Sequence, residues 1–155
     1  MELSLRVNGG TVTVDVPPNM LLAQLLREEL HLTGTHIGCD TTQCGACTVL
    51  LDGEAVKACN LLALQCASRE VTTIEGLKGD NGGLHPVQQA FKDLHGLQCG
   101  FCTPGMVMSI VDLCRREPDA DEARIREALD GNYCRCTGYQ NIVRAVQQAQ
   151  QTLRS

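Results

Sequence analysis

Cysteine is the residue that most constrains how this chain can fold. The sequence of 155 residues contains ten cysteines, and eight of them fall into two groups of four. The first quartet comprises Cys39, Cys44, Cys47 and Cys59. The second quartet comprises Cys99, Cys102, Cys134 and Cys136. Each quartet offers four thiolates to a metal site, and binding a metal to a folded site contributes free energy to folding.

The remaining composition makes such support important. Aromatic residues account for only 3% of the chain and tryptophan is absent, although 43% of the residues are hydrophobic. We therefore expect a thin aliphatic core, with metal sites helping to hold small domains together. The length suits one ordinary domain or two small ones.

The spacing of the first quartet is typical of an iron–sulfur cluster. Four residues separate Cys39 from Cys44, and two separate Cys44 from Cys47. This is the plant-type ferredoxin spacing for a [2Fe–2S] cluster. Zinc sites usually combine two closely spaced cysteine pairs, so the pattern favours iron–sulfur over zinc.

The second quartet is less diagnostic by spacing alone. Two of its cysteines come just before one expected helix and two come just before another. Two helix N-termini that converge on one site would favour negative charge there through their dipoles. A zinc site is the alternative at this quartet.

Charge and hydropathy exclude several other classes. The formal net charge is −5 and no basic cluster exists, so no nucleic-acid partner is expected. No apolar run reaches the roughly 18 residues of a membrane span, so no direct membrane insertion is expected. The N-terminus resembles neither a signal peptide nor a twin-arginine leader, which predicts a cytoplasmic protein. Association with a membrane through a larger complex stays open. In a reducing compartment, ten cysteines favour metal or redox chemistry over disulfides.

The first half of the chain has the pattern of a mixed sheet with one helix. Alternating apolar residues over 3–16 predict a hairpin that turns at Gly9-Gly10. Asn19 is expected to cap a helix that continues to about residue 30. The remaining expected elements are strands at 48–51, 54–57 and 71–74 and helical turns at 59–66.

The pattern changes at Glu75. The glycine-rich run GLKGDNGG is typical of a linker between domains. Beyond it, helical periodicity predicts helices at 86–94 and 104–114, with Thr103 as the N-cap of the second. Asp119 or Asp121 is expected to cap a third helix ended by Gly131, and a fourth follows at 140–153.

Three segments carry a resemblance to a known family: TGTHIGCDTTQCGACTV, HGLQCGFCTPGMVMS and GNYCRCTGYQNIV. They resemble the small iron–sulfur subunits of the molybdenum hydroxylases, the xanthine oxidase family. The similarity is greatest to the small subunits of aerobic carbon monoxide dehydrogenases and covers essentially the whole chain. It implies an α+β fold, with a β-grasp, plant-type ferredoxin-like domain at 1–76 and a four-helix [2Fe–2S]-binding domain at 77–155.

The resemblance also implies roles for individual residues. The first quartet would hold the [2Fe–2S] cluster distal to molybdenum, and the second quartet would hold the proximal cluster. Gln98 matches the family glutamine that hydrogen-bonds the pterin of the molybdenum cofactor. Cys136 matches the family's last ligand, which also approaches that pterin.

The function implied is that of an electron-transfer subunit in an oxidoreductase complex, with no catalytic site of its own. Electrons would pass from molybdopterin in a large subunit through both clusters to FAD in a medium subunit or to another acceptor. The complex would be a dimer of heterotrimers. Its substrate would be carbon monoxide or an N-heteroaromatic compound, which this chain does not decide.

Two alternatives from other classes remain at this point: a free-standing ferredoxin-type carrier and a zinc-stabilised binding protein. The helical second half disfavours the free carrier, which needs only the first half. Cys66 and Cys114 are left over and lie in apolar context, so we expect buried thiols rather than redox centres.

Overall fold

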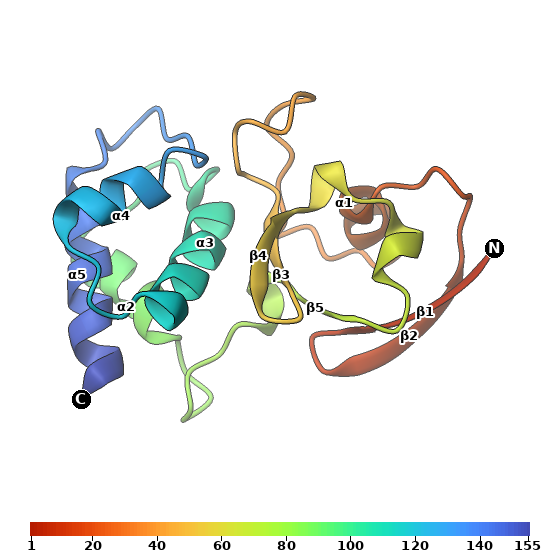
Figure 1. Cartoon of the computed structure of the whole chain (residues 1–155), viewed down its shortest axis with the longest axis horizontal. Helices are drawn as coiled ribbons and strands as arrows, with labels where there is room; N and C mark the ends of the chain where they lie inside the picture. Colours follow the sequence, from red (N-terminus) through yellow and green to blue (C-terminus); the bar gives the residue numbers. More distant parts are fainter.

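The computed structural model describes residues 1–155 and places a β-sheet half beside a helical half along the long axis (Figure 1). The two halves have separate hydrophobic cores, one formed by residues between 3 and 71 and the other by residues between 87 and 149. The α+β fold expected from the sequence is confirmed. No helix combines the length and the apolarity that crossing a bilayer would require.

The sheet contains five strands in the order β2-β1-β5-β3-β4. Their bounds are β1 (Glu2–Val7), β2 (Gly10–Asp15), β3 (Thr48–Leu51), β4 (Glu54–Lys57) and β5 (Glu70–Thr72). Strands β1 and β5 are parallel, and the other neighbouring pairs are antiparallel. The first hairpin turns at Asn8-Gly9, one residue earlier than expected, because both residues have positive φ and so form the turn that suits twisted strands.

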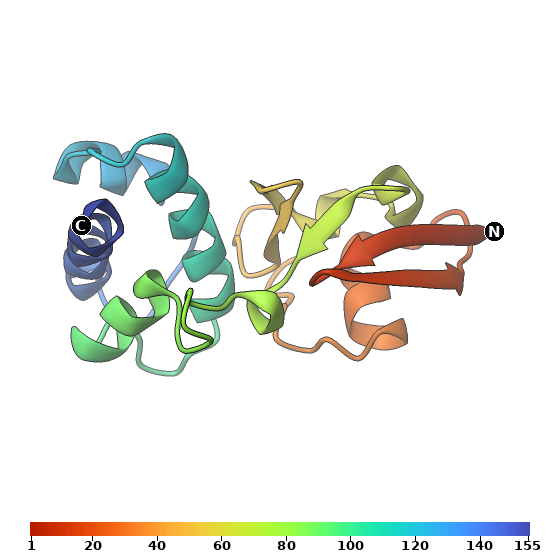
Figure 2. The same cartoon turned by 90° about the horizontal axis from the view of Figure 1, so that it is seen from below.

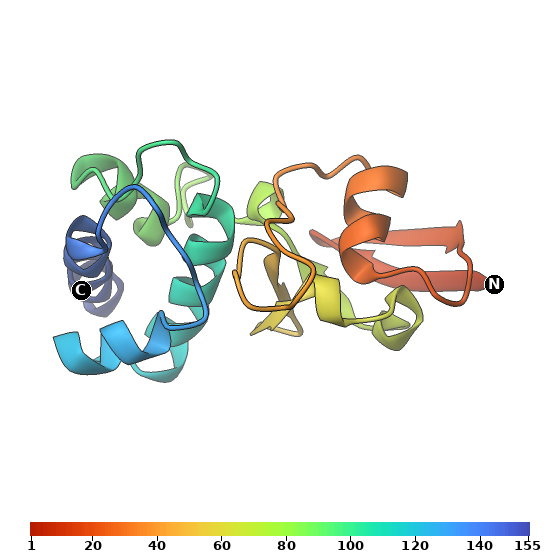
Figure 3. The same ribbon diagram turned by 90° about the horizontal axis from the view of Figure 1, so that it is seen from above.

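The helix across the sheet differs from the expected one. Helix α1 spans only Leu22–Gln24 and continues as a π-helical turn over Leu25–Glu29. Leu21, not Asn19, is its N-cap. The backbone of Leu21 pairs with that of Leu62 in an isolated bridge, which keeps the preceding residues extended. The helix covers one face of the β1–β2 hairpin (Figure 3), where Leu22, Leu25 and Leu26 are buried.

Short helical turns and an early strand end complete this half. Helical turns at Ala58–Asn60 and Ala63–Cys66 occupy the segment where turns were expected. The last strand ends at Thr72, two residues early, and a helical turn at Ile74–Gly76 follows. Ile74 packs against the helical core, so the chain has already left the sheet there.

Four helices form the second half, as expected: α2 (Pro86–Asp93), α3 (Thr103–Arg116), α4 (Glu122–Ala128) and α5 (Gln140–Arg154). Helix α3 includes Thr103 as its first residue, so Cys102 and not Thr103 is the N-cap. Asp121 caps α4 by accepting a hydrogen bond from the Arg124 backbone N–H at 2.8 Å. Helix α4 ends before Gly131, and Asp119 pairs with Arg154 instead of capping.

The two halves meet at the N-terminal part of α3. This helix faces β3 and β4 whether the molecule is seen from below (Figure 2) or from above (Figure 3). The contact is backbone against backbone. A Cβ atom on Gly105 would lie 2.1 Å from the Gly45 carbonyl oxygen, and one on Gly45 would lie 2.2 Å from the Gly131 oxygen. Only glycine permits so close an approach.

Candidate metal centres

The first quartet is assembled from a loop and from the sheet. Cys39 and Cys44 lie in the long loop between the π-helical turn and β3. Cys47 immediately precedes β3 and is buried, and Cys59 lies in the helical turn after β4. The sheet therefore fixes Cys47 and Cys59, whereas the loop presents the other two thiols.

Hydrogen bonds prepare the loop thiols to act as ligands. The backbone N–H of Cys44 points at Cys39 Sγ and that of Ala46 points at Cys44 Sγ, each at 3.5 Å. The hydrogen bond from Cys44 is the main reason why the pKa of Cys39 falls to about 6. Lys57 on β4 closes the loop by donating to the carbonyl oxygens of Thr42 and Gln43 at 2.8 and 3.2 Å.

The sheet-borne thiol behaves in the opposite way. Burial raises the pKa of Cys47 to about 11, and the neighbouring thiols of Cys59 and Cys44 also raise it. Cys59 and Cys44 are therefore the thiols that influence Cys47. A thiolate at Cys47 becomes favourable only when a nearby cation compensates its negative charge. A bound metal ion would provide that cation.

The second quartet lines one cavity of about 290 Å³. Cys102 caps α3, and Cys134 and Cys136 belong to the loop before α5. The remaining lining residues include Cys44 of the first quartet. The two quartets are therefore neighbours that share a wall.

The thiols of the second quartet also differ in character. Burial raises the pKa of Cys102 to about 12, and the neighbouring Cys134 and Cys99 thiols act in the same direction. Burial also acts to raise the pKa of Cys134, but hydrogen bonds from the side chain and backbone of Thr137 lower it overall. Cys99 and Cys136 are exposed, so one edge of this site lies at the protein surface.

The donor sets fit [2Fe–2S] clusters. Each quartet supplies four thiols, two per iron, and backbone N–H groups point at sulfur. A single zinc ion needs its ligands to converge at about 2.3 Å from one point. No three His, Cys, Asp or Glu side chains converge in that way. The cavity at the second quartet has room for a larger, multi-atom group.

Gln98 lies at the exposed edge of the second quartet. Its side-chain Nε2 donates to the carbonyl oxygen of Cys136 at 3.1 Å. The structure thus brings together the two residues for which the resemblance implies a pterin contact. Their contact with a pterin stays a prediction.

Several residues at the junction carry no recognisable signal of their own in the sequence. The N–H of Tyr133 donates to the Cys44 carbonyl oxygen at 2.8 Å, which links the backbones of the two quartets. The buried Asn132 side chain donates to the carbonyl oxygens of Gly45 and Gly105, both at 3.4 Å. A turn sequence near cysteines suggests a loop, but not which carbonyl groups it contacts.

An aromatic pair joins the two cysteine loops at the surface. The rings of His36 and Phe101 stack with centroids 4.7 Å apart, and His36 Nδ1 lies 2.7 Å from the Phe101 carbonyl oxygen. Phe101 lies between two ligands of the second quartet and is half exposed. Cys66 and Cys114 are buried, as expected, and burial raises the pKa of each.

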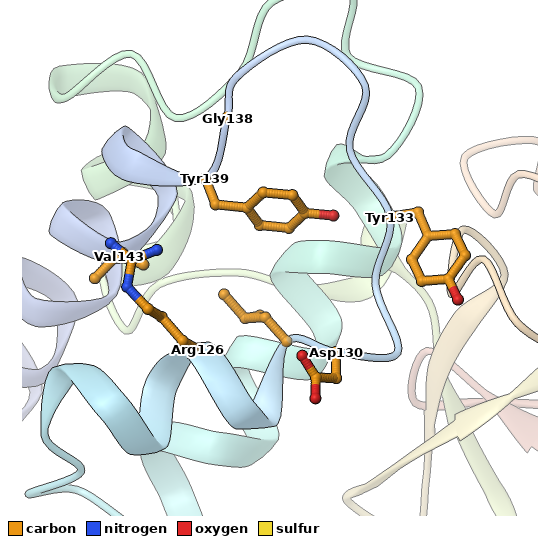
Figure 4. Close-up of a pocket in the computed structure, with 7 residues that line it drawn as sticks. Arg126, Asp130, Tyr133, Gly138, Tyr139 and Val143 are labelled. Carbon is orange, nitrogen blue, oxygen red and sulfur yellow. The ribbon is translucent and has the colours of Figure 1, made fainter.

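The loop of Cys134 and Cys136 also borders a separate cavity of about 350 Å³ (Figure 4). Its lining includes Arg126, Asp130 and Tyr133 but no cysteine. The Tyr139 ring extends across it from the start of α5 towards the loop (Figure 4). Its lining therefore lies apart from the thiols of both quartets.

Comparison with known proteins gives two family matches that together span most of the chain. A 2Fe-2S iron-sulfur cluster binding domain matches residues 5–76, and a [2Fe-2S] binding domain matches residues 73–147. Each match contains one of the two quartets.

Similar proteins cover almost the full length. The beta subunit of the 6-hydroxypseudooxynicotine dehydrogenase complex of Paenarthrobacter nicotinovorans is 50% identical over 145 residues, which are 93% of this chain and 90% of that protein. The gamma subunit of caffeine dehydrogenase of Pseudomonas sp. (strain CBB1) is 46% identical, covering 97% and 91%. In the crystal structure of quinoline 2-oxidoreductase from Pseudomonas putida 86, one chain superposes with a TM-score of 0.92 at 39% identity, covering 99% and 96%.

Proposed function

Because this chain belongs to the small iron–sulfur subunits of the molybdenum hydroxylases, we propose that each of its quartets holds one [2Fe–2S] cluster. The protein is an electron-transfer subunit of an oxidoreductase complex that includes a large subunit. When bound, each cluster supplies one-electron redox chemistry. The eight cysteines are the proposed ligands, with the domain boundary proposed at 76/77.

The observation that carries this proposal is the wall shared by the two quartets. Cys44 of the first quartet lines the cavity formed by the second. The Tyr133 N–H to Cys44 carbonyl hydrogen bond gives a short connection between them through backbone atoms. This arrangement supports transfer of single electrons between the sites inside the protein, without passage through solvent.

We also propose a direction of electron transfer, inferred from which residues around the second quartet are exposed. Gln98 and Cys136 would face the molybdopterin of the large subunit, because both are exposed and joined by a hydrogen bond. The side-chain carbonyl oxygen of Gln98, Oε1, would then be left to accept a hydrogen bond from the pterin. The first quartet would deliver the electrons to FAD in a medium subunit. The proposed assembly is a dimer of heterotrimers.

Electron paramagnetic resonance of the purified, reduced complex tests the two-cluster proposal. We expect two distinct [2Fe–2S] signals and about four iron and four sulfide per small subunit. A single signal with about two iron, or zinc without sulfide, would contradict it. Elution of the native protein as an isolated, fully redox-active small monomer would instead favour a free carrier.

For the substrate, we propose an N-heteroaromatic compound in preference to carbon monoxide. The support is that the similar proteins named above include a caffeine dehydrogenase and a quinoline oxidoreductase. The intact complex can be mixed anaerobically with quinoline, caffeine, nicotine, carbon monoxide or an aromatic aldehyde, and cluster bleaching followed by absorbance. Bleaching only by carbon monoxide or only by the aldehyde would overturn this choice.

A further inference from the structure

The loop between Cys134 and Tyr139 directs a hydroxyl group at sulfur. Thr137 Oγ1 lies 3.2 Å from Cys134 Sγ and accepts a hydrogen bond from the Tyr139 N–H at 3.1 Å. Because a metal-bound thiolate carries no proton, the hydroxyl must be the donor to sulfur. The Thr137 oxygen already accepts a hydrogen bond from the Tyr139 N–H. The proton of the Thr137 hydroxyl is therefore the one donated to Cys134 Sγ.

A ring of hydrogen bonds holds this hydroxyl in place. The Tyr139 phenol oxygen accepts from the Cys134 N–H at 2.8 Å and donates to the Asn132 carbonyl oxygen at 2.9 Å. Tyr139 itself has a φ of 68°, in the left-handed region that non-glycine residues seldom adopt. The phenol reaches across from α5 to the loop (Figure 4). The position of Thr137 is therefore set by the protein and not by the cluster alone.

A second hydroxyl lies beside the same site. Thr103 Oγ1 is buried and has no hydrogen-bond partner in the protein. It is the one buried side-chain nitrogen or oxygen atom of the chain in this situation. A buried hydroxyl without a partner is costly, so an unpaired one points to a group that would complete it. Thr103 directly follows Cys102 of the second quartet, at the start of α3. The acceptor inferred for this hydroxyl is sulfur of a cluster held by the second quartet.

The first quartet has no hydroxyl as close to sulfur as that of Thr137. Its short contacts to sulfur come from the backbone N–H groups of Cys44 and Ala46. Its nearest threonine contact is between Thr42 Oγ1 and Cys59 Sγ at 3.9 Å, much longer than the Thr137 bond. The first quartet therefore provides an internal reference for any effect of the hydroxyls at the second.

Hydrogen bonds to sulfur favour the reduced state of a cluster. Reduction adds one electron and breaks no bond. It makes the net charge of a [2Fe–2S] centre with four thiolates more negative, from about −2 to about −3. A donor stabilises the more negative state more strongly, which raises the reduction potential.

We propose that Thr137 and Thr103 are positioning residues whose hydroxyl groups donate to sulfur at the second quartet and raise the reduction potential of its cluster. The inference rests on the proposed function, since it requires a [2Fe–2S] cluster at this site. It adds two residues outside the cysteine set that decide how readily this cluster accepts an electron.

The test is a redox titration of the intact complex followed by electron paramagnetic resonance. We expect Thr137→Val to lower the equilibrium constant for one-electron reduction of the second cluster about tenfold. This corresponds to a shift of its reduction potential by about 59 mV to lower values. Thr103→Val should shift it in the same direction, and Thr137→Ser should retain most of the parent potential. The first cluster should not shift. Thr152→Val, the same change on the exposed face of α5, is the matched control.

The outcomes separate the inference from the proposed function. A parent complex without two [2Fe–2S] signals would refute the proposed function. Two normal signals, with unchanged potentials in both valine variants, would refute the inference alone. If Thr137→Val fails to assemble the second cluster, the Thr103→Val titration and the Thr137→Ser comparison decide: an unshifted Thr103→Val potential overturns the inference.

Discussion

At the scale of single residues, the important features are the cysteines proposed as cluster ligands and the glycines that allow close approach of the backbones. The thiols differ because backbone N–H groups stabilise the Cys39 thiolate, whereas burial opposes ionisation at Cys47 and Cys102. Gly45 and Gly105 bring the two quartets together, since neither position has room for a Cβ atom. Ligand chemistry and backbone sterics thus meet in the same few residues.

Gly105→Ala should destabilise the protein by about 1–3 kcal/mol, because the added methyl group would lie 2.1 Å from the Gly45 carbonyl oxygen and force the halves apart. Denaturant unfolding followed by circular dichroism measures the loss. Gly10→Ala is the matched control, since its Cβ would make an ordinary 3.6 Å contact with Val7. Equal stability of the Gly105→Ala variant and the parent would contradict the backbone-contact account.

Cys136→Ser should remove the second cluster and lower the iron content from about four to about two per chain. The first-cluster signal should persist, while acceptor reduction by the complex is lost and the helical half loses stability. Iron analysis and spin quantification check this outcome. Cys114→Ala, which replaces a buried thiol outside the quartets, should keep both signals. Normal acceptor reduction by Cys136→Ser would count against the proposed path.

At the scale of elements, short helices are held at their ends by side chains. Arg124 on α4 forms two hydrogen bonds of 2.7 Å with Glu117, which directly follows α3. The hydrogen bond from Arg124 holds the pKa of Glu117 below its usual value. The pair fixes the turn between α3 and α4, and with it the loop that leads to Cys134.

The Glu117–Arg124 pair gives a stability contribution that depends on pH. Because the folded-state pKa of Glu117 is depressed, the contribution is fully present above the unfolded value of about 4.5 and disappears as the pH falls through the folded value. Glu117→Gln should therefore lower the melting temperature at pH 7, with a smaller difference from the parent at pH 4. A difference of equal size at both pH values would rule out this linkage.

At the scale of the whole molecule, two small cores are joined at a narrow junction. Asn132 is central there because its buried side chain donates to a carbonyl from each half, Gly45 and Gly105. The neighbouring Tyr133 N–H bonds to Cys44. These contacts to backbone atoms therefore help to set the relative position of the two quartets.

Asn132→Ala should cost about 1–2 kcal/mol, since it removes the two hydrogen bonds from its buried amide to carbonyl oxygens of both halves. It should also weaken the magnetic interaction between the two reduced clusters, because their relative position becomes less fixed. Asn132→Asp keeps the volume but faces two carbonyl oxygens with a carboxylate, so it should destabilise the protein as well. An Asn132→Asp variant with parental stability and spin interaction would show that the amide donor is unimportant.

Much of the fold was predictable because its signals are local. Strand alternation and the periodicity of four helices depend on neighbouring residues, so the sheet half, the helical half and their order agree with the structure. The helical segment expected to reach about residue 30 is present, but its expected start at Asn19 was wrong, because the bridge between Leu21 and Leu62 is a pairing across a long stretch of sequence.

The sequence by itself determined the number of thiol quartets, and cysteine spacing favoured an iron–sulfur cluster at the first of them. At the second quartet, where spacing is less diagnostic, the resemblance to a known family supplied the same expectation. Only the tertiary structure decided how those sites are connected. The Asn132–Gly45 hydrogen bond spans 87 positions, and the Tyr133 N–H donates to the carbonyl oxygen of the distant Cys44. Such contacts depend on where the backbones converge in space, and no local pattern of residue types encodes that convergence.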